Sequence, residues 1–465
     1  MQLKSIYKVL ATTAILGQTM VGPVLSHADT VSTKSEIHSQ QQNSYENKLG
    51  KLPFINFASE EGDFGDKPKE DAKKYVEDEI KEQEKKMSSS DIQTLLDFFK
   101  KDNKAINDYL IMETGKLLDK DPLNAKIQKL DDILKRQRTE KTVTVYQSVP
   151  KIPLQDALNL KGKILPPDQY RISSLTKDSI VNKKDRPLLE IKVPKGSHAL
   201  YGMNQDSSIL ALIERGAGLL VTDVKQIVDK GISRTKIETK LLSSEEIRNR
   251  EQINDAEVKK AIENLTKENK IKVPVTINSL DPNVSKVIKD AFDVIDQFQG
   301  KINHTLQSQF GPNVTADHLF YQFEKNGGKI SIHDSLLQTG DNAFINGEFR
   351  TTTKEIHLFR NGDGIFMTNT LLHEFGHAYE DLLFNKQLRN DPELIECYRQ
   401  EGDAFGKTFK DIKKLYAGLN ESGQVAEFFA EAFAKFMDEN DNQRLKEVTP
   451  KTYEKIKQIL QKESV

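Results

Sequence analysis

One stretch decides how this chain is interpreted: LLHEFGHAYE at residues 371–380. Residues four apart lie on one face of a helix, so His373 and His377 can direct both imidazoles at one metal ion, with Glu374 beside them. Two imidazoles at this spacing are typical zinc ligands, and the adjacent carboxylate can take a proton from an attacking water. The pattern indicates zinc-dependent hydrolysis with Glu374 as general base. The alternative is two surface histidines on an ordinary amphipathic helix.

The flanking residues favour the metal interpretation. The chain has only nine histidines, so this motif is a rare coincidence. Apolar side chains also form a stripe along the same helix, and Gly376 would let another backbone approach it closely.

A third ligand is expected in AEFFAEAF at residues 426–433. Glu427 and Glu431 lie on one face of a helix made otherwise of Ala and Phe, and buried carboxylates require partners. A metal ion would serve Glu427 and an imidazole N–H would serve Glu431. We therefore expect Glu427 to be the third zinc ligand and Glu431 to orient a ligand. The alternative is that both line a polar groove or pair with Lys or Arg.

Residues 270–465 resemble the catalytic domain of the anthrax toxin lethal factor family, which includes proline-specific secreted endopeptidases. The resemblance is carried by LHEFGHA at 372–378, AEFFAEAF at 426–433 and PKTY at 450–453. It implies one zinc ion per chain, held by His373, His377 and Glu427, with Glu374 as the base.

One position departs from that family. Its members carry a tyrosine seven residues before the third ligand, where the hydroxyl can stabilise an oxyanion. Here that position is Asn420, and Tyr416 lies four residues earlier, within a loop at 415–424 that is longer than in the relatives. We expect Tyr416 to take the role. The alternative is that Tyr416 only packs or faces solvent.

Residues 90–225 resemble the ADP-ribosyltransferase fold of clostridial binary toxins and of the central domain of lethal factor. The motifs are AINDY at 105–109, VTVYQ at 143–147, YRISS at 170–174 and LIERG at 212–216. The family's NAD-binding arginine is replaced by Gln147, and its two catalytic glutamates fall at Ser208 and Leu210. Because these residues lack the required charges, we expect this domain to be degenerate and inactive.

Composition and the N-terminus bear on compartment and partners. The chain has 68 basic and 70 acidic side chains, which gives no net field to attract nucleic acid. Lys4 and Lys8 precede a mostly apolar stretch that ends in Ser26-His27-Ala28, which favours a cleaved secretory signal over a membrane anchor. The single cysteine, Cys397, cannot form an intramolecular disulfide and is expected to be a partly buried hydrophobe.

The predicted fold class is α+β, in two domains of different make-up. A degenerate ADP-ribosyltransferase-like mixed domain comes first, followed by a mostly helical zincin-type metallopeptidase domain with a small sheet. Within the latter, the alternation in residues 349–359 indicates a strand whose edge could pair with an extended peptide, although a plain sheet strand also fits. The expected segments are a signal peptide at 1–28, a flexible linker at 29–60, the transferase-like domain at 61–235, a connecting helical segment at 236–269 and the peptidase domain at 270–465.

The sequence therefore predicts a secreted, extracellular zinc metalloendopeptidase of toxin or virulence-factor type. Its expected partners are a protein or peptide substrate and an unidentified toxin subunit, with no nucleic acid and no integral membrane segment after signal cleavage. Two alternatives remain at this point: an ADP-ribosyltransferase-type toxin and a non-catalytic toxin subunit.

Overall fold

The computed structural model describes most of the chain after residue 60. The described residues are 61–65, 69–113, 115–149, 154–165, 167–177, 186–203, 209–229, 231–281, 283–334, 337–339, 343–359 and 364–464. The expected signal peptide, the expected linker and Ser208 lie outside them. Among these residues, no helix is both long and apolar enough to cross a membrane.

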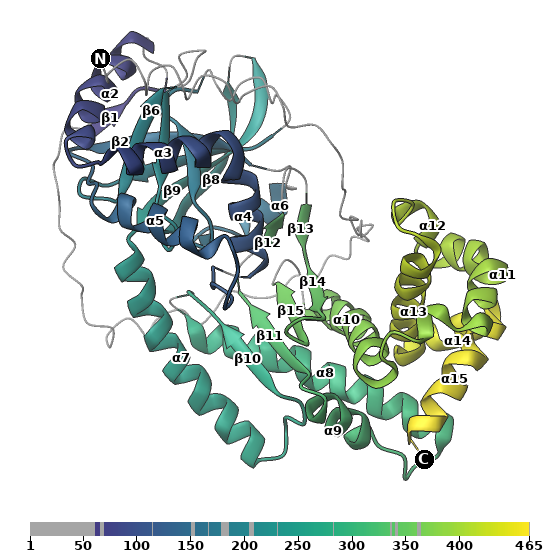
Figure 1. Cartoon of the computed structure of the whole chain (residues 1–465). Coiled ribbons are helices and arrows are strands. Elements are labelled where there is room, and N and C mark those ends of the chain that lie inside the picture. The colour runs from purple at the N-terminus through teal and green to yellow at the C-terminus, as the bar shows by residue number, and fades with distance from the viewer. Residues whose placement is uncertain are drawn as a thin grey trace.

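The N-terminal part is built on a mixed sheet of nine described strands, in the order β3-β8-β9-β5-β2-β4-β7-β6 with β1 alongside β2 (Figure 1). The pairs β1–β2 and β5–β9 are parallel and the others are antiparallel. The strands are β1 (Glu61–Asp63), β2 (Thr142–Ser148), β3 (Ile164–Leu165), β4 (Arg171–Ser174), β5 (Leu188–Val193), β6 (Ala199–Met203), β7 (Ile209–Ile213), β8 (Gly218–Asp229) and β9 (Ile232–Leu242).

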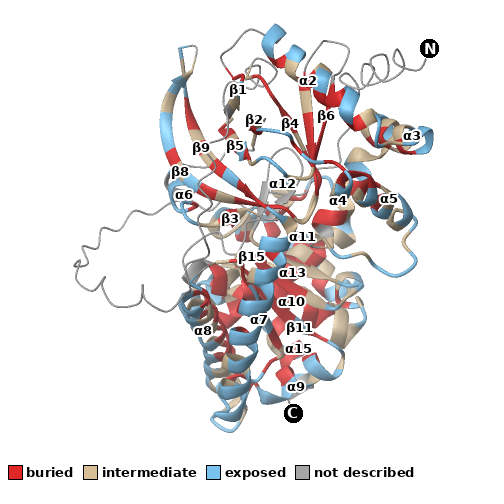
Figure 2. Ribbon diagram, turned by 90° about the vertical axis from the view of Figure 1, so that its left-hand side faces the viewer, coloured by how far each residue is buried: buried red, intermediate tan, exposed pale blue. Residues whose placement is uncertain are grey.

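Helices cover both faces of this sheet. Side chains alternate along a strand, so Leu212 of β7 joins the core under α3–α5, while Ala211 and Ile213 join the core under α2. Figure 2 shows these buried layers on either side of the sheet. The helices are α2 (Lys69–Glu84), α3 (Ser89–Asp97), the π-helical turn η2 (Phe98–Asp102), α4 (Asn103–Met112), α5 (Asn124–Lys135) and α6 (Leu154–Leu158).

A long helix, α7 (Ser244–Lys267), links this part to the next. Ser243 and Glu246 form a capping box at its start. The expected connecting helical segment at 236–269 is therefore helical only from Ser244, because residues before it continue as β9. Asn254 on α7 donates to the carbonyl of Ser279 at 2.8 Å, which fixes the helix against the C-terminal part.

The C-terminal part is mostly helical with a small sheet in the order β10-β11-β15-β14. The first three strands are parallel, and β14 is antiparallel at one edge. The strands are β10 (Val275–Asn278), β11 (Lys329–His333), β14 (Gly347–Arg350) and β15 (Glu355–Phe359), with a separate hairpin of β12 (Leu337–Thr339) and β13 (Ala343–Ile345).

Nine helical segments are described in this part; some lie against the sheet, and the last five form a group away from it (Figure 1). They are α8 (Val284–Phe310), α9 (Asp317–Lys325), α10 (Gly364–Phe384), the 3-10 turn η3 (Leu388–Asn390), α11 (Pro392–Thr408), α12 (Ile412–Leu415), α13 (Glu421–Met437), α14 (Glu439–Val448) and α15 (Pro450–Ser464). Phe375 of α10 lies at the centre of their core, with its ring 5.2 Å from those of Phe298 and Phe323. Cys397 is buried in the same core, as expected for a small hydrophobe.

The stretch 349–359 is not one strand, contrary to the interpretation of its alternation. Residues 351–354 form a turn between β14 and β15, and Lys354 adopts a left-handed φ of 58°. Three consecutive threonines satisfy a strand pattern, but the chain reverses there and a β-hairpin results. As a consequence, the sheet edge belongs to β14 and not to the whole stretch.

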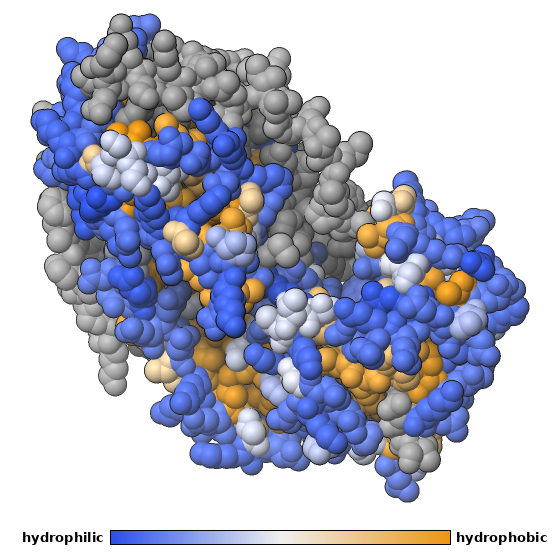
Figure 3. All heavy atoms as spheres, in the orientation of Figure 1, coloured by the Kyte–Doolittle hydropathy of each residue, from blue (hydrophilic) through white to orange (hydrophobic). Residues whose placement is uncertain are grey.

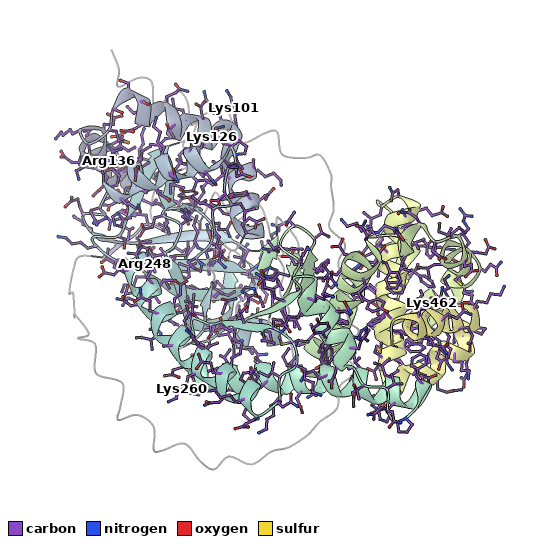
Figure 4. All side chains as sticks on the ribbon, turned by 60° about the horizontal axis from the view of Figure 1, so that its bottom comes forward. Lys101, Lys126, Arg136, Arg248, Lys260 and Lys462 are labelled. Atoms are coloured by element: carbon purple, nitrogen blue, oxygen red, sulfur yellow. The ribbon has the colours of Figure 1, made fainter. Side chains whose placement is uncertain are left out.

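The drawn face of the molecule is dominated by hydrophilic residues, with apolar side chains in smaller groups (Figure 3). Basic side chains are spread over both parts. Figure 4 labels examples from η2 to α15. They are Lys101, Lys126, Arg136, Arg248, Lys260 and Lys462.

Candidate metal centre

Helix α10 presents His373 and His377 on one face, one turn apart, with ring centroids 4.9 Å apart. Glu427 of α13 lies against both rings. Its Oε2 is 3.6 Å from Nε2 of His373 and its Oε1 is 3.5 Å from Nε2 of His377. One ligand atom from each of the three residues lies within 4.8 Å of the other two. This His-His-carboxylate set fits a zinc ion, which takes three such ligands and leaves a further position open.

A close approach of two helices makes this convergence feasible. A Cβ on Gly376 would lie 2.9 Å from the Cα of Ala430 on α13. Only glycine leaves room for that backbone. Because Ala430 follows Glu427 by three residues, the contact holds the Glu427 carboxylate at the height of the two imidazoles.

The electrostatics of the cluster favour positive charge between the residues. Burial lowers the pKa of His373, but hydrogen bonds to Glu427 and Glu431 outweigh it and raise the value to about 10. Burial raises the pKa of Glu427, yet the His377 and His373 rings together hold it far below its usual range. The carboxylate is thus ready to accept a cation.

Glu431 lies one turn further along α13, behind the cluster. Its Oε2 is 3.1 Å from Nδ1 of His373, on the side of the ring away from Glu427. A carboxylate at this position fixes the orientation of a ligating imidazole and raises its basicity. The structure places Glu431 beside His373, and its orienting role stays a prediction.

Glu374 is 7% exposed and lies on α10 beside the edge strand β14. A Cβ on Gly347 of β14 would lie 3.0 Å from Cγ of Glu374 and 2.6 Å from Cγ2 of Thr370. The strand therefore passes directly over the Glu374 side chain. An extended chain beside β14 would bring its backbone to this carboxylate.

Tyr416 follows the short helix α12, and its hydroxyl is hydrogen-bonded to Glu427. Burial, followed by the negative charge of Glu427, raises the pKa of this phenol, so it is protonated and can donate. Asn420 instead caps α13, accepting from the N–H of Gly423 at 2.9 Å. The structure thus brings Tyr416 to the cluster by a different route along the chain from the one usual in the family.

Lys410 was missed by the sequence interpretation. Its Nζ lies 3.3 Å from Oε2 of Glu431 and 3.4 Å from the Tyr416 hydroxyl. Nothing in the local pattern marks this lysine among the 68 basic residues, because its partners come from a turn and a distant helix.

The motif at 450–453 serves the fold and not the cluster. The backbone N–H groups of Lys451 and Thr452 donate to the buried Glu401 carboxylate at 3.0 and 2.8 Å. These bonds satisfy the free N–H groups at the start of α15.

Gln147 and Leu210, two of the positions predicted to lack transferase charges, lie on β2 and β7 of the N-terminal sheet, on either side of β4. Nε2 of Gln147 donates to the carbonyl of Ile172 at 2.7 Å, so its amide is engaged by the neighbouring strand. Leu210 lies in β7 opposite Ser174 of β4. Neither residue supplies the cation or carboxylate that the transferase chemistry needs.

Fold and site together define a two-part chain, in which a mixed-sheet domain precedes a mostly helical part that carries an HExxH helix and a third carboxylate. Residues 246–459 match the family model for anthrax toxin lethal factor, N- and C-terminal domain. Residues 72–244 match the model for ADP-ribosyltransferase exoenzyme. Residues 246–459 are therefore similar to the lethal factor family, and the resemblance drawn from the sequence is confirmed.

Solved structures similar to the chain are ADP-ribosyltransferase toxins. C3larvin toxin from Paenibacillus larvae is 26% identical over 35% of this chain and 100% of that chain, with a TM-score of 0.32. Plx2a from the same organism is 24% identical over 39% of this chain and 100% of that chain, with a TM-score of 0.34. C3stau2 from S. aureus is 19% identical over 40% and 100%, with a TM-score of 0.34. No curated protein matches the chain.

Proposed function

We propose that this protein is a secreted, toxin-type zinc metalloendopeptidase whose C-terminal part is a zincin-type catalytic domain. The observation that carries the proposal is the convergence of His373, His377 and Glu427, with Glu374 and the Tyr416 hydroxyl beside them. The family match of residues 246–459 supports the same class. The proposed boundaries place the catalytic domain at 270–465, after a signal peptide at 1–28.

A zinc ion held by His373, His377 and Glu427 would supply Lewis acidity, which lowers the pKa of water toward neutrality and polarises a carbonyl. Glu374 would accept the proton of the attacking water and pass it to the leaving amine. Tyr416 would donate a hydrogen bond from its hydroxyl to the oxyanion that develops on the substrate carbonyl. Glu431 would keep the His373 ring in place through Nδ1.

The substrate would be an extended peptide paired with β14. This strand lies at the edge of the described sheet and passes over Glu374. Backbone pairing with a sheet edge positions a peptide without demanding a particular sequence. The scissile carbonyl would then lie between Glu374 and Tyr416.

The test compares the wild-type protein with Glu374→Gln on a peptide library, each with and without a chelator. We expect about one zinc ion per chain in both, measured by elemental analysis, because Glu374 is not a ligand. Cleavage should fall about 10²- to 10⁴-fold in Glu374→Gln and vanish with the chelator. Wild-type protein that binds zinc but cleaves nothing in the library would contradict the proposal.

A second candidate is an ADP-ribosyltransferase-type toxin, favoured by the family match of residues 72–244. The hydrogen bond of Gln147 to the backbone and the apolar Leu210 oppose it. This candidate predicts NAD hydrolysis that persists in Glu374→Gln and in chelator. We expect no such hydrolysis.

A further inference from the structure

The contacts of Lys410 extend the proposed site beyond the residues that touch a metal or a substrate. Lys410 lies in the turn after α11, and its side chain is 19% exposed. Its Nζ reaches two groups at once. They are the Glu431 carboxylate at 3.3 Å and the Tyr416 hydroxyl at 3.4 Å, and the ammonium also lies 5.6 Å from the centre of the Tyr416 ring.

The direction of these hydrogen bonds determines where the tyrosine proton points. A lysine ammonium has donors only, so the Tyr416 oxygen must accept from Lys410. The hydroxyl proton is then left free to donate on the other side, where it meets Glu427. A phenol held in this way presents its proton toward the metal cluster and not toward solvent.

Tyr416 comes from a short element between two longer helices. Helix α12 has four residues, and Tyr416 is its C-cap. The backbone carbonyl of Tyr416 accepts from Nε2 of Gln424 at 3.2 Å, which fixes the main chain at this residue. Lys410 gives the phenol oxygen a second connection to α13, through Glu431, besides its hydrogen bond to Glu427.

We propose that Lys410 is a positioning residue for the peptidase reaction, an inference that rests on the proposed function. Lys410 orients the Tyr416 hydroxyl toward the oxyanion by bridging that hydroxyl to Glu431. Lys410 does not touch the substrate or the metal cluster directly. We expect its effect to pass through Tyr416 and not through Glu431 and His373, so it should disappear when the Tyr416 hydroxyl is removed.

The test is a double-mutant cycle with Lys410→Met and Tyr416→Phe in the full chain. Tyr416→Phe should lower kcat about 10²-fold, as loss of an oxyanion donor does. Lys410→Met should lower kcat about tenfold with KM and zinc content unchanged, and it should have no further effect in the Tyr416→Phe background. Lys410→Arg, which keeps a cationic donor, should recover most of the loss.

Lys414→Met is the matched control, because Lys414 is an exposed lysine on α12 and should behave as wild type. The assignment of Lys410 fails if its effect persists in Tyr416→Phe, if Lys410→Met loses zinc, or if Lys410→Arg is as impaired as Lys410→Met. If instead the wild type cleaves no peptide, the proposed function itself fails. The two failures are thus distinguishable.

Discussion

Gly376 is the residue on which the geometry of the metal cluster depends most directly. It lies between the two histidines, and its missing side chain lets α13 approach α10. The gap is narrow: an added methyl group would lie 2.9 Å from Cα and 3.2 Å from the carbonyl oxygen of Ala430. Both are backbone atoms that cannot turn aside, so the helices themselves would have to separate.

Replacing Gly376 with alanine should therefore damage both stability and metal binding. We expect Gly376→Ala to lower the free energy of unfolding by about 1–3 kcal/mol, as overpacking does. It should also weaken zinc binding, because Glu427 moves with α13. Thermal unfolding across a zinc titration measures both effects.

Gly300→Ala on α8 is the control for that substitution. It lies inside a helix with nothing within 4 Å of the added methyl group, so it should stabilise the protein by up to about 1 kcal/mol. If Gly376→Ala melted at or above the wild-type temperature and bound zinc as tightly, the helix contact would not control the site.

Among the residues of the candidate site, those that lie close together along one helix could be predicted from the sequence. The spacing of His373 and His377 predicts their common face, and the same holds for Glu427 and Glu431. Lys410 could not be predicted this way, because its contacts cross from a turn to α13. Tyr416 was predicted only by its closeness in sequence to Asn420, and its hydroxyl reaches Glu427 through the shape of α12.

At the level of elements, the small sheet of the C-terminal part buries two histidines side by side. Nε2 of His333 on β11 lies 2.9 Å from Nδ1 of His357 on β15, and the rings are stacked 5.2 Å apart. Phe359 stacks on His333, and Glu355 lies 3.6 Å from Nε2 of His357. This pair belongs to the face of the sheet opposite Ile330, Ile332, Ile356 and Leu358.

The pKa values of both histidines are depressed in the folded protein. Burial, with smaller contributions from the charges of Arg350 and Lys116, lowers the pKa of His333 to about 3. Burial also lowers the pKa of His357 to about 2, aided by Arg350, His333, Lys116 and Lys329. Both rings are therefore neutral in the folded chain under ordinary conditions.

This depression makes stability depend on pH in a definite direction. In the unfolded chain a histidine has a pKa of about 6.5. Above that pH the folded and unfolded states bind the same number of protons at these two rings, so the free energy of unfolding has its full value. As the pH falls from about 6.5 toward 3, only the unfolded chain takes up protons at these rings, so stability is lost. The slope for two protons is at most roughly 2.7 kcal/mol per pH unit.

Unfolding by denaturant between pH 7 and 4, in chelator so that metal loss does not contribute, measures this slope. His357→Gln should lower stability at pH 7 and flatten the loss below pH 6.5. His304→Gln, at an exposed site on α8, should leave the slope unchanged. A His357→Gln slope equal to that of wild type would contradict the assignment.

The elements themselves were predicted with uneven success, for a physical reason. Helices with a regular apolar face, such as α10 and α13, follow from their periodicity. The reversal at residues 351–354 does not, because a run of threonines suits a strand and the turn depends on the left-handed Lys354. The connecting helical segment was predicted to begin at residue 236, before the start of α7. The end of β9 carries charged residues in about the same proportion as the helix, so composition does not separate them.

On the scale of the whole molecule, apolar clusters join the two parts. Ile164 of β3, Leu242 of β9 and Ile247 of α7 pack with Leu280, which follows β10. Ile111 of α4 packs against Phe359 of β15. The order of the two domains could be predicted from their motifs, but these contacts join segments far apart in sequence and leave no periodic pattern.

Such contacts should make the two parts unfold together. By the proposed function, zinc binds the folded site and not the unfolded chain, so it should stabilise every segment that unfolds in the same cooperative unit. We expect hydrogen exchange to slow on zinc addition not only in α10 and α13 but also in β5 and β9 of the N-terminal sheet. Mass spectrometry of the full chain, with zinc or with chelator, measures this.

The coupling should depend on the joining clusters and not on stability in general. Ile111→Ala combined with Leu280→Ala should confine the zinc effect to the C-terminal part. Leu306→Ala removes a fully buried side chain of the C-terminal core and should cost about 2–5 kcal/mol. It should nevertheless leave the protection of β5 and β9 responsive to zinc. If zinc never protects β5 and β9 in the wild type, the two parts unfold independently and the clusters at Leu280 and Ile111 join them without coupling them.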